Sequence, residues 1–160
     1  KIPGEARLIG IGMDFGYSND PTAIVQIWKW NDKRILHEIA YQTGLVNSEI
    51  ARMLPNNVII YADSAEPKSI EEIRRTGKNI RGVTKGKDSI MFGISTMQEQ
   101  EYLVTTNSTN IIKEFQYYCW DTDRNGKKLN KPVDNFNHLM DAIRYHEMMD
   151  IGINNKVFTF

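Results

Sequence analysis

The sequence contains a single cysteine in 160 residues, and this scarcity excludes several classes of protein. One thiol cannot build a disulfide framework or a cysteine-based zinc site, so a reducing compartment is expected. Cys119 stands among aromatic residues, which favours buried packing over a role as nucleophile. No run of 18 apolar residues is present, so no membrane partner is expected. The first residues also lack the apolar core of a secretory signal.

The sequence has no net charge either, because 20 basic residues balance 20 acidic ones. This balance disfavours a strongly basic nucleic-acid-binding protein, but the charges are unevenly distributed. Between Lys68 and Lys87 basic residues far outnumber acidic ones. Such a stretch is either a solvated surface or a contact for a nucleic-acid backbone, and both interpretations stay open.

The spacing of apolar residues predicts one mixed α/β domain, in which helices flank a sheet. An antiparallel meander comes first, and parallel strands alternating with helices follow. We expect residues 1–7 to be a linker, residues 8–150 the folded domain and residues 151–160 a tail. The main expected strands are 8–15, 22–30, 34–41 and 58–62, and the main expected helices are 47–54, 67–75, 89–101, 108–115 and 135–149.

Three aspartates occupy positions that suit metal ligands. Asp14 and Asp63 each follow an apolar strand, and Asp141 lies within the last helix. If the two strands run parallel side by side, both acids share the sheet edge where ligands bind in open α/β folds. A carboxylate there is costly unless a cation offsets its charge. Magnesium or manganese would do so, and two ions about 4 Å apart can hold both the attacking and the leaving oxygen of a phosphodiester.

Several neighbours could join this site. Gly16 is expected to let the chain turn close to a bound ion. Asp20 fits a structural turn, and Glu66 fits either a ligand or an acid that a helix dipole stabilises. His138 precedes Asp141 by one helical turn and could bind metal, move a proton, contact phosphate or remain a surface histidine.

Each aspartate also has a purely structural alternative. Asp14 could accept backbone hydrogen bonds in a hairpin, and Asp63 could cap a helix. Lys85 and Lys87 flank a glycine at a helix start, which suits a phosphate, although the spacing of a nucleotide-binding P-loop is absent. Together with Arg74 and Arg81 they are the expected DNA contacts, unless these charges are only solvated.

Four stretches, in this order, resemble the C-terminal nuclease domain of large terminase subunits from tailed bacteriophages. They cover most of residues 8 to 149. The resemblance implies a ribonuclease H-like fold and an endonuclease that cuts concatemeric double-stranded DNA during genome packaging. It also implies that Asp14, Asp63 and Asp141 bind the metal ions. The stretches are Gly12-Met13-Asp14-Phe15-Gly16 with Asp20-Pro21-Thr22-Ala23, Ala62-Asp63-Ser64-Ala65-Glu66-Pro67, Lys85-Gly86-Lys87-Asp88-Ser89-Ile90 and His138-Leu139-Met140-Asp141-Ala142-Ile143-Arg144-Tyr145.

The same resemblance implies partners that this chain does not contain. They are an ATPase motor domain of the full-length protein, the terminase small subunit and the portal, all acting in the host cytoplasm. Because the chain has no phosphate-binding loop, ATP hydrolysis is not expected of it.

Two other functions compete with a nuclease. An actin-like ATPase also begins with Asp-x-Gly after a strand, as Asp14-Phe15-Gly16 does, but Asp63-Ser64-Ala65 lacks the second glycine. A ribonuclease H-like module could instead bind DNA or act as a scaffold without catalysis. The presence of all three acids favours the enzyme, and manganese-dependent nicking would separate the two.

Overall fold

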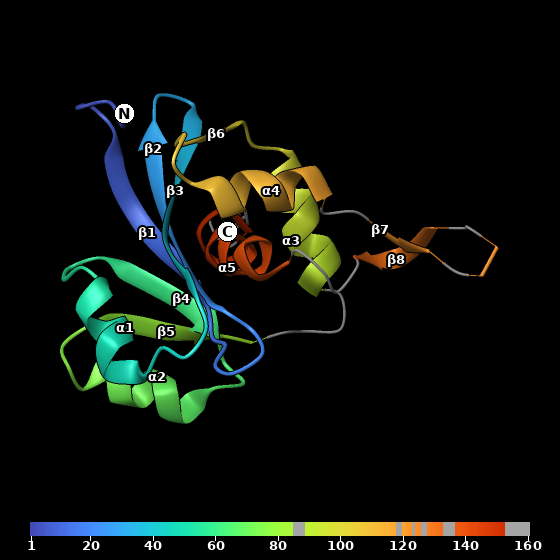
Figure 1. The fold of residues 1–160 in the computed structure, drawn as a ribbon. Coiled ribbons are helices and arrows are strands. Elements are labelled where there is room, and N and C mark those ends of the chain that lie inside the picture. The colour runs from blue at the N-terminus through green and yellow to red at the C-terminus, as the bar shows by residue number, and fades with distance from the viewer. Residues whose placement is uncertain (85–88, 118–119, 123, 126–127, 133–136, 153–160) are drawn as a thin grey trace, which may run out of the picture.

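The fold is a mixed six-stranded sheet with helices on both faces (Figure 1). The computed structural model describes residues 1–84, 89–117, 120–122, 124–125, 128–132 and 137–152. The strands of the sheet are β1 Arg7–Asp14, β2 Thr22–Trp30, β3 Lys33–Gln42, β4 Ile59–Asp63, β5 Asn79–Val83 and β6 Tyr102–Val104. The helices are α1 Asn47–Met53, α2 Pro67–Arg74, α3 Ser89–Gln98, α4 Thr109–Tyr117, α5 His138–Glu147 and the π-helical η1 Met148–Gly152.

The order of the strands is β5-β4-β1-β2-β3-β6. Strands β1, β2 and β3 form the antiparallel meander, whereas β4 runs parallel to both β1 and β5, and β6 runs parallel to β3. A separate antiparallel pair, β7 Trp120–Thr122 and β8 Lys128–Pro132, projects beside α3 (Figure 1). This topology confirms the predicted fold class.

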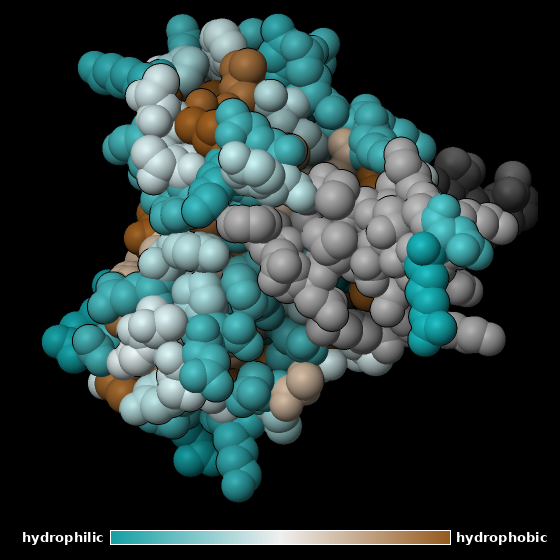
Figure 2. Space-filling view, turned by 45° about the vertical axis from the view of Figure 1, so that its right-hand side comes forward, coloured by the Kyte–Doolittle hydropathy of each residue, from teal (hydrophilic) through white to brown (hydrophobic). Residues whose placement is uncertain are grey.

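The core is split into two layers by the sheet. Helices α1 and α2 pack on one face over Ile11, Met13 and Ile60, while α3, α4 and α5 pack on the other face over Val25 and Ile27. On the face shown in Figure 2, hydrophobic residues form small separate spots among hydrophilic ones. The apolar residues of the described chain are therefore mostly buried in the two core layers.

Two glycines of β1 let α5 lie directly on the sheet. A Cβ added to Gly10 would lie 2.2 Å from the Nε2 atom of His146, and one added to Gly12 would lie 1.9 Å from the carbonyl oxygen of Ala142. No side chain fits in that space. The close approach fixes where α5 crosses β1, and hence where the first turn of α5 meets the end of the strand.

Acids from neighbouring elements cap two helices of this layer, α4 and α5. The Oε1 atom of Glu38, on β3, accepts the N–H groups of Asn110 and Ile111 at the start of α4, each at 3.0 Å. Glu114, on α4, in turn accepts the N–H groups of Leu139 and Met140 at 3.2 and 2.9 Å. The sheet thus positions α4, and α4 positions the start of α5.

The sequence predicts Asn47 or Ser48 as the cap of α1 and Ser108 as the cap of α4. The first prediction is wrong, because the cap of α1 is Val46, whose N–H donates to Glu49 Oε1 in the first turn. Ser108 does precede α4, and its carbonyl oxygen accepts the N–H of Ile112 at 3.1 Å. Its hydroxyl accepts the Glu38 N–H at 2.8 Å, however, so the Glu38 carboxylate binds the first N–H groups of the helix.

Two further expectations need correction, and others fall outside the described residues. The last helix begins at His138 instead of residue 135, because Asn137 is its non-helical cap and Glu114 supplies the acceptors. Strand β4 is not buried on both faces: Ile60 and Ala62 are buried, whereas alternate residues are partly exposed. The predictions for Lys85, Lys87, Cys119 and Asp134 lie outside the described residues.

Among the described residues, no helix has the length and apolar content needed to cross a membrane.

The contact at Gly12 predicts a large effect of one added methyl group. Gly12→Ala should destabilise the domain by at least about 2 kcal/mol, because the obstructing atom is helix backbone and cannot rotate away. Gly4→Ala is the matched control, since a Cβ there meets nothing within 4 Å. Urea unfolding of both variants measures the difference, and equal stabilities would contradict the close contact.

The capping acid of α5 predicts a second stability effect. Glu114→Ala leaves two buried N–H groups without an acceptor, which should cost about 2–4 kcal/mol of unfolding free energy. Gln116→Ala, at an exposed position of the same helix, should change stability by no more than about 0.5 kcal/mol. If the two substitutions cost the same in urea unfolding, Glu114 does not cap α5.

The pH dependence of this cap has a defined sign. Burial raises the pKa of Glu114, and its two backbone hydrogen bonds only partly oppose this shift. Protonation of Glu114 therefore favours the folded state. Its contribution to the unfolding free energy is complete below the unfolded pKa of 4.5, and it is lost as the pH rises through the folded pKa. Lowering the pH from neutral towards 4.5 should stabilise the wild type relative to Glu114→Gln in urea unfolding. A shift towards the variant would contradict this.

Candidate metal site

Asp14 and Asp63 end two adjacent parallel strands. In the register of β1 and β4, Met13 lies opposite Ala62, so the two aspartates that follow lie at the same edge of the sheet. Side chains alternate between faces along a strand. Asp14 therefore points to the same face as Gly12, on which α5 lies. This edge is where the sequence placed the two acids.

Asp63 is held by two hydrogen bonds. Its Oδ1 accepts the N–H of Ala65 at 2.9 Å, and its Oδ2 accepts the hydroxyl of Tyr145 at 3.4 Å. The first bond closes the turn before α2, so the structural alternative for Asp63 holds in part. The second comes from a residue of α5 that is only 1% exposed, and it ties the carboxylate to that helix.

His138 stands between two acids at the start of α5. Its Nδ1 lies 3.6 Å from Asp14 Oδ2, and its Nε2 lies 3.6 Å from Asp20 Oδ1. The pKa of His138 is raised, mainly by its interaction with Asp14, although burial opposes the shift. Asp20 thus reaches the edge of the site, whereas Glu66 is the residue that caps α2. The imidazole is placed to accept and return a proton beside Asp14.

Asp141 lies in the first turn of α5, and its carboxylate turns towards Arg144. The Arg144 Nη2 donates to Asp141 Oδ1 at 2.9 Å, and the guanidinium side chain is only 3% exposed. Its Nε and Nη1 atoms have no hydrogen-bond partner. In the described part of the chain, Asp14, Asp63 and Asp141 do not form a group in which one ligand atom of each residue lies within 4.8 Å of the other two. Helix α5 thus reaches the edge where Asp14 and Asp63 lie, and the convergence of the three carboxylates on a bound ion stays a prediction.

The loop after Asp14 is closed by hydrogen bonds between the Gly16 backbone and the Thr22 side chain. Gly16 exchanges two hydrogen bonds with the buried hydroxyl of Thr22, at 3.1 and 3.0 Å. A Cβ at Gly16 would lie 2.2 Å from the carbonyl oxygen of Asp20. The glycine is needed for this tight return of the chain, and its approach to a bound ion stays a prediction.

The basic residues predicted to contact DNA differ in whether their side chains are already bonded within the protein. The Arg74 guanidinium donates to Glu71 Oε2 at 2.5 Å and to the Ile80 carbonyl at 3.3 Å, so it links α2 to β5. Arg81 is exposed on β5, opposite Tyr61 in the register of the neighbouring strand.

Sequence reasoning missed two residues that shape the site. Glu114 caps α5, and Arg144 pairs with Asp141. Arg144 carried one detectable signal, because it follows Asp141 by three residues on the same helix. Glu114 carried none, because its partners lie about 25 residues away.

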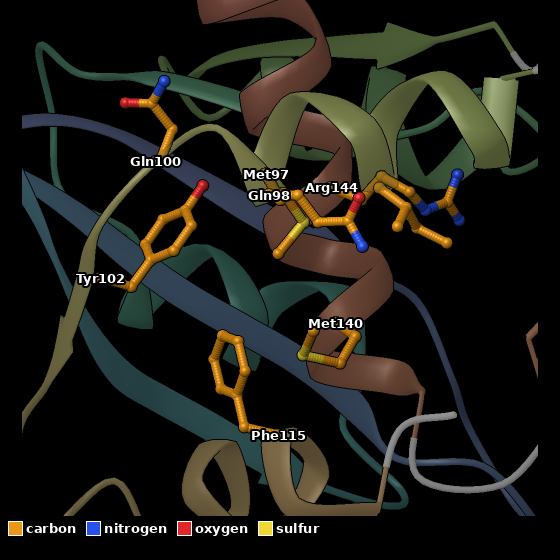
Figure 3. Close-up of a pocket in the computed structure, with 8 residues that line it drawn as sticks. Met97, Gln98, Gln100, Tyr102, Phe115, Met140 and Arg144 are labelled. Atoms are coloured by element: carbon orange, nitrogen blue, oxygen red, sulfur yellow. The ribbon is translucent and has the colours of Figure 1, made fainter. Parts of the chain in front are cut away.

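A pocket of about 300 Å³ lies on another side of α5 (Figure 3). Met97, Phe115 and Met140 surround it, and no acid is among its lining residues. Arg144 lines it as well, as Figure 3 shows. The pocket is therefore lined by both apolar and polar side chains, and none of the three aspartates is among them.

Comparison with known proteins agrees with this geometry. The chain matches the family described as Terminase RNAseH like domain over residues 14–146. It is 32% identical over 147 residues to the large terminase subunit of Bacillus phage SPP1. This match covers 84% of this chain and 34% of that protein. The chain thus spans about one third of the length of this curated relative.

Solved structures share the fold. A crystal structure of the g2p (large terminase) nuclease domain from bacteriophage SPP1 with bound Mn has a TM-score of 0.77 and 30% identity, covering 90% of this chain and 88% of that one. The large terminase nuclease from thermophilic phage G20c with bound magnesium has a TM-score of 0.62 at 15% identity, covering 91% and 82%, and shows the fold alone. The chain therefore belongs to the terminase ribonuclease H-like family, as the C-terminal nuclease domain of a phage large terminase subunit.

Proposed function

We propose that the domain is a metal-dependent endodeoxyribonuclease that cuts concatemeric double-stranded DNA by two-metal-ion hydrolysis. The observation that carries this proposal is the shared sheet edge, where Asp14 and Asp63 end adjacent parallel strands. Helix α5 begins at the same place and brings His138 to 3.6 Å from Asp14. The manganese bound to the related SPP1 domain supports the choice of cation.

The side chains at the edge suit magnesium or manganese. Asp14, Asp63 and Asp141 offer carboxylate oxygens, which hard divalent cations prefer. In this structure Arg144 offsets part of that charge by pairing with Asp141, and His138 lies beside Asp14. Two bound ions would supply a water of lowered pKa and stabilise the leaving oxygen.

The residues around the three aspartates take the other proposed roles. We assign His138 to proton transfer or phosphate contact, because three carboxylates and waters can already complete an octahedral shell. Its two ring nitrogens each face an acid, so it can pass a proton between the site and solvent. Tyr145 holds Asp63 in position through its hydroxyl group.

DNA binding is proposed for the basic residues beside this edge. Arg81 is exposed on the strand next to β4, and Lys85 and Lys87 follow that strand in the sequence. Arg74 takes a lesser part, because Glu71 and the Ile80 carbonyl already engage its guanidinium. Contacts of this kind bind the phosphate backbone without reading the sequence, so specificity would come from partners.

The proposed partners follow from the length of the relative. An ATPase motor domain on the same polypeptide would feed DNA to this domain, and the terminase small subunit and the portal would direct the cut. Assembly in the host cytoplasm completes the proposal.

The two strand-end acids provide the main test. Asp14→Asn and Asp63→Asn should each slow manganese-dependent plasmid nicking by more than about 100-fold, because each removes a metal ligand. Without metal, the melting temperature should hold or rise, since repulsion between carboxylates is relieved. Asp32→Asn, an exposed acid in the β2–β3 turn, is the control. Wild-type nicking by both variants would remove these acids from the mechanism, whereas no manganese-dependent nicking by the unsubstituted chain would leave a non-catalytic DNA-binding module.

His138 has a separate signature. His138→Ala should bind manganese almost normally in calorimetry but cut about 100-fold more slowly, because a proton-transfer group is lost while the ligands stay. Asp20→Asn should have a much smaller effect, since the Asp20 side chain is 70% exposed at the edge of the site. Lost manganese binding would make His138 a ligand, and wild-type cutting would remove it from the mechanism.

A further inference from the structure

A second group of candidate ligands lies at the opposite end of α5 from the aspartates. His146, Glu147 and Asp150 each offer one ligand atom, and these atoms all lie within 4.8 Å of one another. Among the described residues this is the one group of three that meets that distance. His146 and Glu147 are both 0% exposed, so the group is built into the interior.

Two of these atoms are buried without a hydrogen-bond partner. They are Nδ1 of His146 and Oε1 of Glu147, which lie 3.9 Å apart. Unpartnered polar atoms in the interior are rare and costly, so each calls for an explanation. Tetrahedral nitrogen and oxygen ligands at zinc bond lengths are about 3.4 Å apart. A shift of about half an ångström would therefore let both atoms reach one ion.

The imidazole is oriented and in the right protonation state. Its Nε2 edge faces strand β1, where only Gly10 leaves room for the ring. The Ile9 backbone is near enough to act on the pKa of His146, although the geometry does not make a hydrogen bond. Burial lowers this pKa well below its usual range, so the ring is neutral at neutral pH. Neutral imidazole is the form that binds metals.

Arg34 holds both carboxylates from the other side. Its Nη1 donates to Glu147 Oε2 at 2.5 Å, and its Nη2 lies 2.7 Å from Asp150 Oδ2. Glu147 Oε1 takes no part in these contacts, and the buried Tyr102 hydroxyl lies near enough to the Glu147 carboxylate to act on its pKa. Outer partners of this kind orient carboxylate ligands in metal sites. Burial raises the pKa of Glu147 to about 7. With both carboxylates ionised, the two acids and the guanidinium leave one negative charge, so a divalent cation is not repelled by the group as a whole.

The local helix geometry produces the ligand spacing. His146 and Asp150 are four residues apart, and Glu147 precedes Asp150 by three, so all three lie on one side of the helix end. The turn that carries Asp150 is the π-helical segment η1, and single π-helical turns are frequent at functional sites. A histidine with a second ligand four residues on is also the spacing used by helical zinc sites.

Solvent can reach the group through one side. Asp150 and Arg34 line an open cavity of about 420 Å³, and the Asp150 side chain is 29% exposed. Arg7 and Lys29 also line this cavity, but both are exposed, so salt screens their repulsion of an entering cation.

We propose that His146, Glu147 and Asp150 form a structural site for a divalent transition metal such as Zn²⁺, separate from the three aspartates. One nitrogen and two carboxylate ligands suit zinc or cobalt better than magnesium. Because all three ligands come from α5 and η1, the ion would fix the end of this helix, which Arg34 links to β3. This proposal does not depend on the nuclease mechanism.

Cobalt titration tests the site directly. The chain carrying Asp14→Asn, Asp63→Asn and Asp141→Asn lacks the other candidate carboxylate ligands, and visible absorption then reports cobalt with a low coordination number. We expect saturation at one ion per chain and displacement by zinc. Adding Asp150→Asn should weaken binding at least about tenfold, whereas adding Asp32→Asn should not. The substituted amide can still accept from Arg34, and circular dichroism checks the fold.

Thermal unfolding of the same chains gives a second measurement. Zinc should raise the melting temperature of the parent chain in a concentration-dependent way, because the ion binds only the folded state. The rise should shrink with Asp150→Asn. No saturable cobalt binding at millimolar metal, or equal binding with Asp150→Asn, would overturn the proposal. Nicking is not a readout here, so failure of the nuclease proposal would leave this result unchanged.

Discussion

The close contact between α5 and β1 is the constraint on which the rest of the structure depends. Two residues of a strand rise by about 6.6 Å, and four residues of a helix rise by about 6 Å, so their repeats nearly match. Gly10 therefore lies under His146, Gly12 lies under Ala142, and the next step along both elements brings Asp14 to His138. Without side chains at the two glycines, the helix rests on the strand and carries its first turn to the sheet edge.

The polarity of the same helix suits the acids at its start and opposes those at its end. The N-terminus of a helix carries partial positive charge, and there Glu114, Asp14 and Asp141 gather. The other end carries partial negative charge, so Glu147 and Asp150 are unfavourable there and Arg34 offsets them. Two groups of ionisable residues thus share one element, each held by partners from other parts of the chain.

Much of this arrangement could be predicted because it depends on local patterns. The strand of residues 22–30 has the predicted bounds, and Asp14 and Asp63 share an edge because each ends an apolar strand. The caps could not be predicted, since Glu38 and Glu114 reach their helices across the fold. For the same reason the π-helical end and its ligand group left no sequence pattern strong enough to notice.

The orientation of Asp141 shows where prediction from residue type stops. A sequence can place a carboxylate on a helix face, but which cation the carboxylate meets depends on the balance of nearby charges. Here Arg144 is buried, with two of its nitrogens unpartnered, and it holds Asp141 by one hydrogen bond. Under the proposed function, Asp141 exchanges Arg144 for a metal ion. The Arg144 guanidinium then has only weak alternative partners inside the protein. On that proposal, metal affinity at the aspartates would be set by this competition as much as by the three carboxylates.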